Sequence, residues 1–520
     1  MPRHLWSVSV VFPMVLANAV HRAEPAVPGA VVGCEALAAG DFTTVQDAPT
    51  QVDVARRLPA AERVPAHCRV EGYVSPNIRF VLVLPEGSGW RERFMVVSPG
   101  AYGGSTGSGG WCDEALRRGY ACLAHDTGHS GGANWASWAY NNLQAELDYG
   151  IRAHHVVAVA GKAIVERHLG AVPRYSYHVG ISAGGKQGLT AAQRHSWDFD
   201  GILAMEPSSP TATGVVVHWN ALVTHDADGN PLFQTADLRV LHQGAIDACD
   251  ADDGLEDGVI GGDPRTCRFD PGVLQCRTGQ NSGCLSQAQV EAARKVYEGA
   301  VTSTGEKLSK YFPFYPPLPG SEMGGYFTRD LDYKTTYWQF MGFSPDPGPT
   351  WTAKDFDFDR DYQRVGTMDA VLNGYANPDL RNFRVAGGKV MIVQGWEDAG
   401  LPNPSVTVDF YEMVERIIGD RARTQEFLRL FMIPGRSHGG GGVGASSADY
   451  LSYLEAWVEK DEAPDMVIGY HAESGGSNYA VPDQYGFTRP HYPYPLQARY
   501  RGTGDPNDYR SFEPFDPQRR

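Results

Sequence analysis

The stretch YSYHVGISAGGKQGL, Tyr175–Leu189, runs a strand-like segment directly into a serine that is flanked by glycines. Its centre, Gly180 to Gly184, matches the pattern G-x-S-x-G, in which a strand reverses abruptly into a helix with the serine at a strained apex. The flanking residues must be small because strand and helix pass close together. The pattern predicts that Ser182 is a nucleophile beside a helix N-terminus, which favours developing negative charge. A plain Gly/Ser turn has the same five-residue pattern, so the surrounding sequence must distinguish the two.

The segments around this serine alternate between strand and helix. From about Arg79 the runs FVLVLP, FMVVSPG and GYACLAHDTG are apolar and end in turn residues, which is typical of strands. The stretch LQAELDYGIRAHHVVAVAGKAIVERHLG then has apolar residues near helical spacing and ends at Gly170. Such alternation predicts a mostly parallel sheet that is covered by helices on both faces.

The alternation fails between residues 208 and 383, which are rich in Pro, Gly, Asp and aromatic residues. It resumes with KVMIVQGWED and continues through the strand FLRLFMIPG to the helix ADYLSYLEAWVEK. We therefore predict an α/β core formed by residues 24–207 and 384–520, with a lid domain inserted at 208–383. The Pro/Tyr/Arg-rich tail after about Tyr470 is expected to cover the surface in irregular form.

The first 23 residues resemble a signal peptide. Arg3 and His4 precede an apolar run that ends at Leu16, and the small triplet Ala17 to Ala19 follows. Cleavage is expected after Ala19 or Ala23, although a buried N-terminal helix has a similar pattern. We predict a secreted or periplasmic protein, in which the eight cysteines form disulfides.

The composition of the 520 residues excludes several classes of partner. The net charge is −16 and there is no basic block, which argues against nucleic acid and anionic membrane surfaces. No later segment has the roughly 18 unbroken apolar residues of a membrane span. We expect a small-molecule substrate, and the sequence predicts no particular oligomeric state.

Two later turns supply the partners that a serine nucleophile needs. Asp398 follows the strand at 390–393 in the turn GWEDAG, and His438 follows the strand at 427–433 in PGRSHGGGG. The chain order Ser, Asp, His, each on a turn after a core strand, is that of α/β-hydrolases. His438 is predicted to take the proton of Ser182, and Asp398 to orient the imidazole. Glu397 is the rival acid, and His129 is a rival base that precedes the serine.

The oxyanion of an ester intermediate needs two convergent N–H donors. One is predicted at Ala183, directly after the nucleophile. The other is predicted in the glycine-rich loop at 99–104, at Gly100 or Ala101. A plain glycine-rich connection is the alternative for that loop.

The segment CDADDGLEDGVIGGDPRTC, Cys249–Cys267, places five carboxylates within residues 250–257. These charges repel one another unless a cation neutralises them, and calcium prefers such oxygen-rich sets. The predicted ligands are the side chains of Asp250, Asp253 and Asp257 and the carbonyls of Leu255 and Val259. Asp252 and Glu256 are candidate bystanders, and an acidic surface loop is the alternative.

Taken together, these segments resemble the tannase and feruloyl esterase family of secreted α/β-hydrolases. The similarity extends from about Cys34 to Phe515 and rests on DTGH, GISAGG, FDGILAMEP, CDADDGLEDGVI, NPDLRNF, GGKVMIVQGWED and RPHYPYPLQARYRGTGD. It implies an α/β-hydrolase fold, the triad Ser182, Asp398 and His438, and structural calcium in the lid. It also implies disulfides within three pairs: Cys34–Cys68, Cys249–Cys267 and Cys276–Cys284.

The chain departs from this family at two cysteine pairs. The family typically has a cysteine directly before the serine and another directly after the histidine, where this chain has Ile181 and Gly439. Two tail cysteines are likewise replaced, by Tyr492 and Pro514. Because both partners of each pair are missing, the resemblance still implies hydrolysis, with a different restraint on the catalytic loops. Cys112 and Cys122 lie outside the pattern and are either bridged or buried thiols.

The resemblance implies an esterase for aromatic acids such as gallate, ferulate, other hydroxycinnamates or a terephthalate monoester. The aromatic segment YKTTYWQFMGF at 333–343 is a candidate wall for such rings, and a lid core is the alternative. Two other functions use the same residues. One is a peptidase or amidase with this triad, and the other is a calcium-dependent binding protein without activity.

Overall fold

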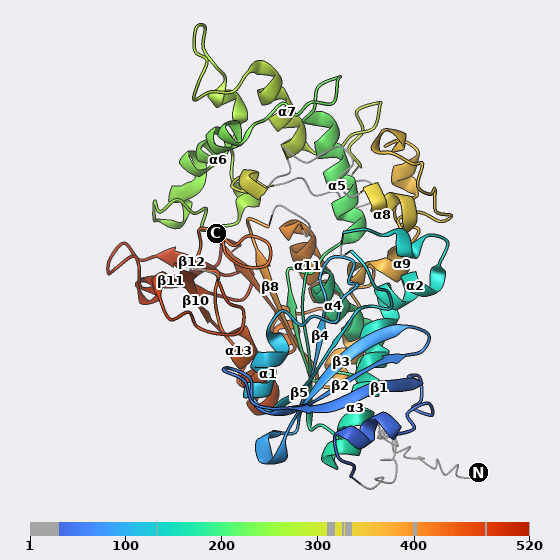
Figure 1. Cartoon of the computed structure of the whole chain (residues 1–520). Helices are drawn as coiled ribbons and strands as arrows, with labels where there is room; N and C mark the ends of the chain where they lie inside the picture. Colours follow the sequence, from blue (N-terminus) through green and yellow to red (C-terminus); the bar gives the residue numbers. More distant parts are fainter. Residues whose placement is uncertain are drawn as a thin grey trace, which may run out of the picture.

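The computed structural model describes residues 31–132, 134–308, 318–324, 327, 335–398, 403–473 and 476–518. Its centre is a nine-stranded sheet in the order β1-β2-β3-β5-β4-β6-β7-β8-β9 (Figure 1). The strands are β1 (Thr50–Leu58), β2 (His67–Val74), β3 (Ile78–Pro85), β4 (Arg93–Ser98), β5 (Tyr120–His125), β6 (Tyr175–Ile181), β7 (Gly201–Met205), β8 (Lys389–Gly395) and β9 (Leu428–Ile433). The predicted signal peptide, residues 1–23, lies outside the described residues.

The sheet has a parallel and an antiparallel part. From β5 to β9 every pair is parallel, whereas β1, β2 and β3 pair antiparallel and β3 joins β5 antiparallel. The parallel part is buried on both faces, so its strands are continuous apolar runs. In β7, Ile202 and Ala204 pack into one apolar cluster and Leu203 and Met205 into another. Burying each such large side chain contributes about 1.5–3 kcal/mol.

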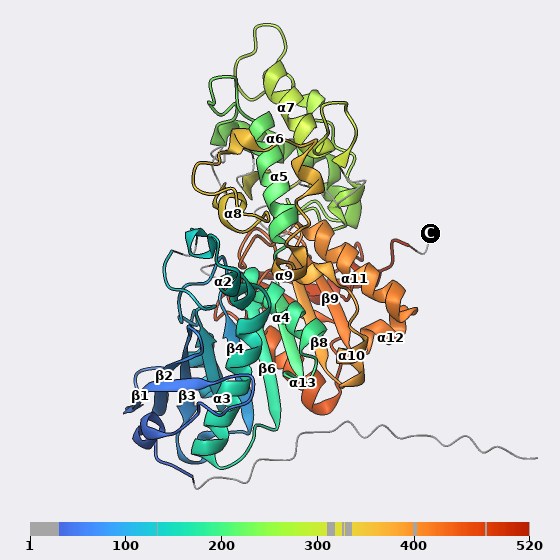
Figure 2. The same cartoon turned by 90° about the vertical axis from the view of Figure 1, so that its right-hand side faces the viewer.

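Helices cover the two faces of the parallel part (Figure 2). Residues of α3 (Ala153–Leu169), α4 (Ala183–Arg194) and α11 (Pro404–Ile418) share a cluster with one face. Residues of α1 (Trp111–Arg117) and α13 (Tyr450–Lys460) share a cluster with the other face. The shorter helix α2 (Leu143–Leu147) precedes α3 in the chain, and the shorter helix α12 (Arg421–Gln425) follows α11. The arrangement matches the layered sheet that the sequence predicts.

The segment between β7 and β8 forms the lid above the sheet (Figures 1 and 2). Its helices are α5 (Pro210–Val223), α6 (Thr235–Cys249), α7 (Gln287–Glu298), α8 (Thr335–Phe340), α9 (Asp369–Leu372) and α10 (Arg381–Val385). Trp338 and Phe343, from the aromatic segment at 333–343, are buried in the lid's apolar cluster. Tyr333 and Lys334 of that segment lie outside the described residues. The described part of the segment therefore contributes to the core of the lid.

The last part of the predicted insertion packs on the α/β core. The Tyr375 hydroxyl donates to the Pro207 carbonyl at 2.6 Å, and Arg194 of α4 donates to the Ala370 carbonyl at 2.6 Å. Phe383 is fully buried in the cluster of the α3 and α4 face. The end of the segment predicted as the lid, 208–383, therefore also packs on the α/β core.

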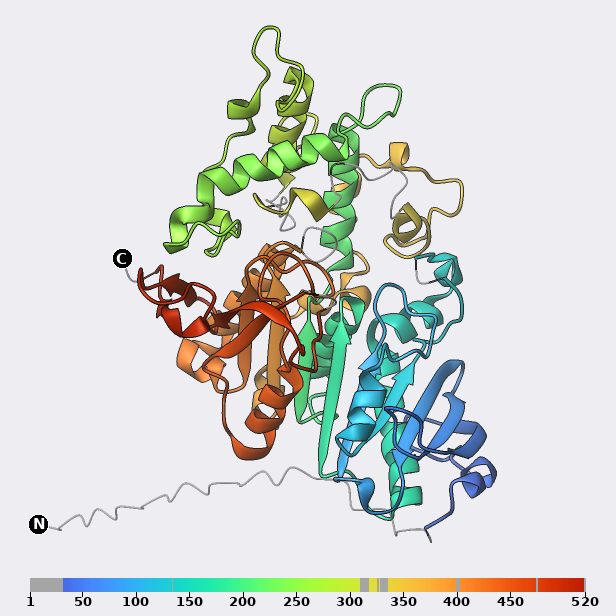
Figure 3. The same ribbon diagram turned by 60° about the vertical axis from the view of Figure 1, so that its left-hand side comes forward.

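The tail is more regular than the sequence suggested. It forms two antiparallel ribbons, β10 (Val467–Ala472) with β11 (Tyr485–His491), and β12 (Gln497–Tyr500) with β13 (Phe512–Phe515). Figure 3 shows these ribbons beside the β8–β9 end of the sheet and below α6 of the lid. The expectation of an irregular tail is wrong, because backbone pairing across turns offsets the local effect of its prolines.

Four disulfides join the eight cysteines. Three are the pairs implied by the family resemblance, Cys34–Cys68, Cys249–Cys267 and Cys276–Cys284. The fourth joins Cys112 in α1 to Cys122 in β5, which decides between the bridge and the buried thiols. Within the described ranges, no helix has both the length and the apolar character to cross a bilayer.

Candidate active site

Ser182 stands at a strained turn between β6 and α4. Its backbone adopts φ 62° and ψ −121°, a region that a residue with a side chain rarely occupies. Small neighbours permit the turn, since a Cβ on Gly184 would lie 2.3 Å from the Ser98 carbonyl oxygen. The Ser182 N–H donates to the Met205 carbonyl at 2.9 Å, which fixes the apex beside β7. This is the strand-to-helix elbow that the sequence predicts.

Asp398 and His438 meet at the ends of the neighbouring strands β8 and β9. The two atoms His438 Nδ1 and Asp398 Oδ2 lie 3.0 Å apart, and Asp398 is fully buried. Burial raises the pKa of Asp398 to about 6, although the adjacent imidazole opposes that rise. Burial lowers the pKa of His438, but Asp398 and Glu206 outweigh this effect, so the pKa lies above its usual value. The pair can therefore hold a proton on the imidazole.

The two rival residues face elsewhere. Glu397 points toward the lid, where burial raises its pKa to about 7 and His242 of α6 opposes the rise. His129 is stacked on Trp138, with ring centroids 3.8 Å apart, and burial lowers its pKa to about 4. Neither residue shares the acid–imidazole contact of Asp398 and His438.

The serine and the histidine approach the same edge of the sheet. Ile181 pairs with Met205 in β7, which pairs with Val393 in β8, so the turns after these strands are neighbours. Among the described residues, no hydrogen bond joins the Ser182 hydroxyl to His438. Such contacts are often loose before substrate binds and tighten in the reacting complex. Ser182 is 5% exposed, whereas the His438 side chain is 30% exposed toward solvent.

Sequence reasoning missed two charged residues in this site. Glu206 follows β7 and Arg436 lies two residues before His438, and both are fully buried. The atoms Arg436 Nε and Glu206 Oε1 lie 2.6 Å apart. The Gly439 N–H donates to Glu206 Oε2, so this ion pair restrains the histidine turn. The available signal was positional, because Glu206 directly follows an apolar core strand and Asp398 follows another after a short turn.

The glycine-rich loop after β4 lies against the elbow. A Cβ on Gly100 would be 3.8 Å from the Ser182 Cβ, and Ala101 has φ 50°, in the left-handed region. The Tyr149 hydroxyl donates to the Ala101 carbonyl at 3.1 Å. Both candidate donors of this loop, Gly100 and Ala101, are therefore near the helix N-terminus where Ala183 begins α4.

The DTGH segment at 126–129 packs against the glycine-rich loop at 99–104 and hydrogen-bonds to it. The Gly104 N–H donates to the Asp126 carbonyl at 2.8 Å, and the Thr127 hydroxyl donates to the Tyr102 carbonyl at 3.3 Å. Thr127 also has positive φ, at 68°. The segment therefore fixes the position of the loop beside Ser182.

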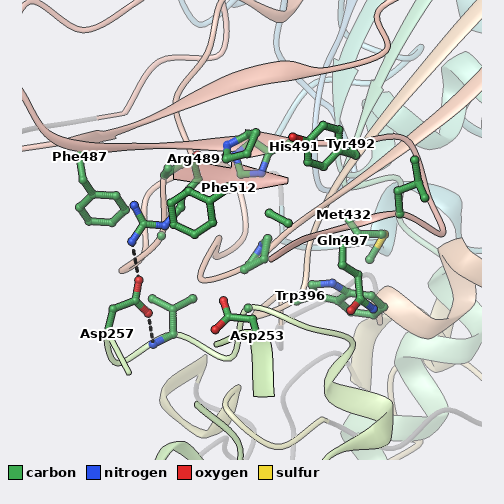
Figure 4. A pocket seen from close by; sticks show the side chains of 18 of the residues that line it. Asp253, Asp257, Trp396, Met432, Phe487, Arg489, His491, Tyr492, Gln497 and Phe512 are labelled. Carbon is green, nitrogen blue, oxygen red and sulfur yellow. Dashed lines mark hydrogen bonds and ion pairs between the residues drawn. The ribbon is translucent and has the colours of Figure 1, made fainter. Parts of the chain in front are cut away.

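The acidic loop of the lid faces the C-terminal tail. Figure 4 shows Asp253 and Asp257 at one pocket, with Arg489 of β11 opposite. Arg489 pairs with Asp257 at 2.5 Å, a contact that sequence reasoning missed. Burial raises the pKa of Asp253 to about 7, and the charges of Asp257 and Asp250 add to the rise. A half-buried carboxyl among like charges fits a site for a hard cation.

The other predicted ligands belong to the same loop, which the Cys249–Cys267 disulfide closes. Asp250 accepts the N–H of Gly258 at 2.9 Å and that of Val259 at 3.2 Å, and Asp253 accepts the N–H of Leu255 at 2.9 Å. These bonds fold the loop around its carboxylates. The oxygens of Asp250, Asp253 and Asp257 do not all lie within 4.8 Å of one another, so binding of an ion would draw them together.

Two groups in the described part of the chain do bring three potential ligand atoms within 4.8 Å: His155, His195 and Asp198, and Glu206, Asp398 and His438. In the first, the imidazoles stack with centroids 3.9 Å apart at 6°, whereas a metal must lie in the plane of each ring. In the second, Arg436 already supplies the positive charge. Neither geometry favours a metal ion.

The chain is similar in sequence to a known family of esterases. A family model described as "Tannase and feruloyl esterase" matches residues 62–330 and 350–514. Mono(2-hydroxyethyl) terephthalate hydrolase of Piscinibacter sakaiensis is 32% identical, over 92% of this chain and 91% of its own length. A probable feruloyl esterase of Arthroderma benhamiae is 28% identical, over 83% of this chain and 81% of its own length.

Solved structures agree with the architecture. The structure of feruloyl esterase B from Aspergillus oryzae superposes with a TM-score of 0.79 at 25% identity, covering 93% of this chain and 100% of that one. Tannin acyl hydrolase from Aspergillus niger gives a TM-score of 0.76 at 19% identity, covering 94% and 95%. The predicted α/β-hydrolase core with its large insertion is therefore confirmed as the fold class.

Proposed function

The chain belongs to the tannase and feruloyl esterase family of ester hydrolases, and on that premise we propose that it hydrolyses carboxylic esters through a serine acyl-enzyme. The observation that carries the proposal is the 3.0 Å contact of Asp398 and His438 beside the strained turn of Ser182. Strain of that kind is retained where a side chain must project from the backbone.

The proposed chemistry assigns each residue one step. His438 accepts the proton of the Ser182 hydroxyl while the serine oxygen bonds to the ester carbonyl carbon. The carbonyl oxygen then becomes an oxyanion. The N–H of Ala183 and that of Gly100 or Ala101 stabilise this oxyanion. His438 then donates its proton to the departing alkoxide, which leaves as the alcohol. Water then attacks the carbonyl carbon of the acyl-enzyme while His438 accepts its proton. Return of this proton to the Ser182 oxygen releases the acid. Asp398 supports the imidazolium in both halves.

We propose that the acyl group is an aromatic acid, of the hydroxycinnamic, gallic or related kind. The names of the relatives support this class, since they include a terephthalate monoester hydrolase and feruloyl esterases. The apolar cluster that contains the first residue after the nucleophile also contains aromatic side chains, which supports this class as well. Tyr102 and Tyr337 share an apolar cluster with Ala183, the first residue after the nucleophile. Flat aromatic rings favour such walls because stacked and edge contacts add to area burial.

A substrate panel tests this proposal. Methyl gallate, methyl ferulate, chlorogenate and mono(2-hydroxyethyl) terephthalate are compared with an aliphatic ester and a peptide amide. We expect the highest kcat/KM among the aromatic esters, and loss of all turnover in Ser182→Ala. Preference for the amide would instead support a peptidase, and absence of turnover of every ester by the wild-type protein would support a binding protein on this fold.

We also propose that the lid holds one structural calcium ion. Its ligands are the carboxylates of Asp250, Asp253 and Asp257 and the carbonyls of Leu255 and Val259. The raised pKa of Asp253 supports a cation there, because a positive charge would remove the repulsion. The Asp257–Arg489 pair joins the loop to the tail, so an ion at this place would stabilise the contact between lid and core.

Export from the cytoplasm is the remaining proposal. Four disulfides support it, because such bonds persist in oxidising compartments and are rare in the cytosol. Expression with residues 1–23 intact, followed by N-terminal sequencing of the extracellular or periplasmic fraction, tests it. We expect a mature chain that begins after Ala19 or Ala23.

A further inference from the structure

We propose that Glu206 is a positioning residue for His438 and a second carboxylate that stabilises the protonated imidazole. The proposal rests on the serine mechanism above, since it assigns a role within the same site. Glu206 has no part in the three-residue triad. Its position between the nucleophile and the acid nevertheless brings it against the histidine.

The sheet places Glu206 among the catalytic turns. Ser182, Glu206 and Asp398 follow β6, β7 and β8, which are adjacent in the sheet, and His438 follows β9. The Glu206 N–H donates to the Val393 carbonyl at 2.7 Å, and its φ of 44° turns the chain sharply after the strand. A non-glycine residue keeps such a backbone only where its surroundings hold it there.

The Glu206 carboxylate holds the histidine turn from both sides. Oε1 lies 2.6 Å from Arg436 Nε, before the histidine, and Oε2 accepts the N–H of Gly439, after it. Arg436 also donates to the Ser446 carbonyl at 2.5 Å and to Asn478 Oδ1 at 2.9 Å. His438 is therefore clamped between two anchored neighbours, although four glycines, Gly439 to Gly442, follow it.

The charges near the imidazole explain why a carboxylate is needed in addition to Asp398. His438 Nδ1 lies 3.0 Å from Asp398 Oδ2 and 3.7 Å from Glu206 Oε2. The buried guanidinium of Arg436 in the same turn opposes protonation of the imidazole, and the Tyr450 hydroxyl of α13 faces Arg436. Two carboxylates and one guanidinium leave one net negative charge for the imidazolium. Without Glu206, Arg436 would cancel the charge of Asp398.

The test compares kinetics and pH profiles of charge-changing variants on an ester that the wild-type enzyme hydrolyses. We expect Glu206→Gln to lower kcat about tenfold to hundredfold, with KM within about twofold of wild type. The acidic limb of kcat/KM should move to lower pH, because the imidazole loses a neighbouring negative charge. Glu206→Asp keeps the charge, so its acidic limb should stay at the wild-type position.

A double variant separates charge from folding. Glu206→Gln leaves Arg436 buried and unpaired, which destabilises a fold strongly. In Glu206→Gln/Arg436→Gln both charges are removed, Asp398 alone faces the imidazole, and the acidic limb should return toward wild type. Glu397→Gln is the matched control, since this nearby carboxylate faces the lid, and its limb should not move.

Two results overturn the proposal, and they differ from failure of the serine mechanism. A Glu206→Gln enzyme with the wild-type acidic limb would show that the carboxylate does not act on the imidazole. If that variant does not fold, a double variant whose acidic limb does not return toward the wild-type position would contradict the charge balance on which the proposal depends. Ser182→Ala is assayed in parallel, because turnover that survives this change removes the serine mechanism itself.

Discussion

Asp398 is fully buried, and its Oδ2 lies 3.0 Å from Nδ1 of His438 at the ends of two adjacent parallel strands. A buried carboxylate in this position holds one imidazole tautomer and stabilises its protonated form. The pKa of His438 lies above the usual 6.5, since Asp398 and Glu206 together outweigh burial. Hydrolysis should therefore increase with pH as His438 loses its proton above pH 6.5.

The first prediction concerns this pH dependence. His438 must be neutral to accept the serine proton, so kcat/KM should rise with pH through an acidic limb above pH 6.5. In Asp398→Asn the limb should move to lower pH, and kcat should fall about 10²–10³-fold, less than the roughly 10⁴-fold typical of a serine triad, because Glu206 retains part of the stabilisation. Initial rates between pH 5 and 9 measure both effects. A limb below pH 6 in the wild-type enzyme would contradict the prediction.

The second prediction concerns Lys186, one helical turn after the nucleophile. Its buried Nζ has no hydrogen-bond partner among the residues that the structure describes and lies 4.0 Å above the centre of the Tyr149 ring, and burial lowers its pKa to about 7. The unfolded chain binds a proton here between about pH 7 and pH 10.5, and the folded chain does not. Stability should therefore rise with pH across that window. Lys186→Met should remove this dependence and stabilise the fold at pH 7 by a few kcal/mol.

Lys162→Met is the matched control for that substitution. The Lys162 Nζ donates to the Asp198 carbonyl at 2.5 Å, so its removal deprives a buried carbonyl of its partner. Urea unfolding at pH 7 and pH 9 measures both variants. We expect the Lys162 variant to be less stable than wild type, and a Lys186 variant that behaves in the same way would contradict the interpretation.

The third prediction concerns calcium. A chelator should lower the Tm of the wild-type protein, and added calcium should restore it. Asp253→Asn should abolish that response. Without calcium, the same variant should match or exceed the wild type in stability at pH 8, because the half-buried carboxyl of Asp253, with its pKa of about 7, is then charged among like charges. Folding stability should change, whereas KM for the ester should not.

Asp252→Asn serves as the calcium control. Asp252 is exposed and lies next to the proposed ligand Asp253. Its substitution therefore removes a charge from the same loop without removing a ligand. Differential scanning calorimetry with and without chelator compares the three proteins. An unchanged Tm of the wild type on chelation would show that the loop is an acidic surface loop.

The fourth prediction concerns the disulfide between Cys112 and Cys122. It joins the start of α1 to β5 across a separation of 10 residues. Replacing both cysteines by serine should cost about 2–3 kcal/mol of unfolding free energy, because the bridge restricts the unfolded chain. Denaturant unfolding of the double variant measures this loss, and ester turnover at 25 °C should be retained. Unchanged stability would contradict a structural role.

The sequence pointed to those residues of the candidate site that have local signatures. Ser182 lies in a recognisable elbow, and Asp398 and His438 each follow an apolar strand in a glycine-rich turn. Glu206 follows a strand in the same way, but the segment MEP has no such turn, and its partner Arg436 is 230 residues away. Contacts of that separation depend on the order of strands in the sheet, which the strand pattern alone does not give.

In the fold as well, the sequence predicted features that depend on neighbouring residues but not those that depend on distant contacts. Alternating strands and helices predicted the parallel sheet, because hydrophobic periodicity is encoded residue by residue. The ribbons of the tail were missed because β10 and β11 pair across a gap in which several turn residues intervene. The Asp257–Arg489 contact was missed for a related reason, since it joins the lid to that tail.

Active-site labelling tests the serine mechanism most directly. The protein is incubated with a fluorophosphonate or a slowly hydrolysed aryl ester, and the labelled peptide is identified by mass spectrometry. We predict a single adduct on the peptide that contains Ser182, absent in Ser182→Ala and formed at least about 10²-fold more slowly in His438→Ala. Labelling at another residue, or full ester turnover by Ser182→Ala, would contradict the mechanism.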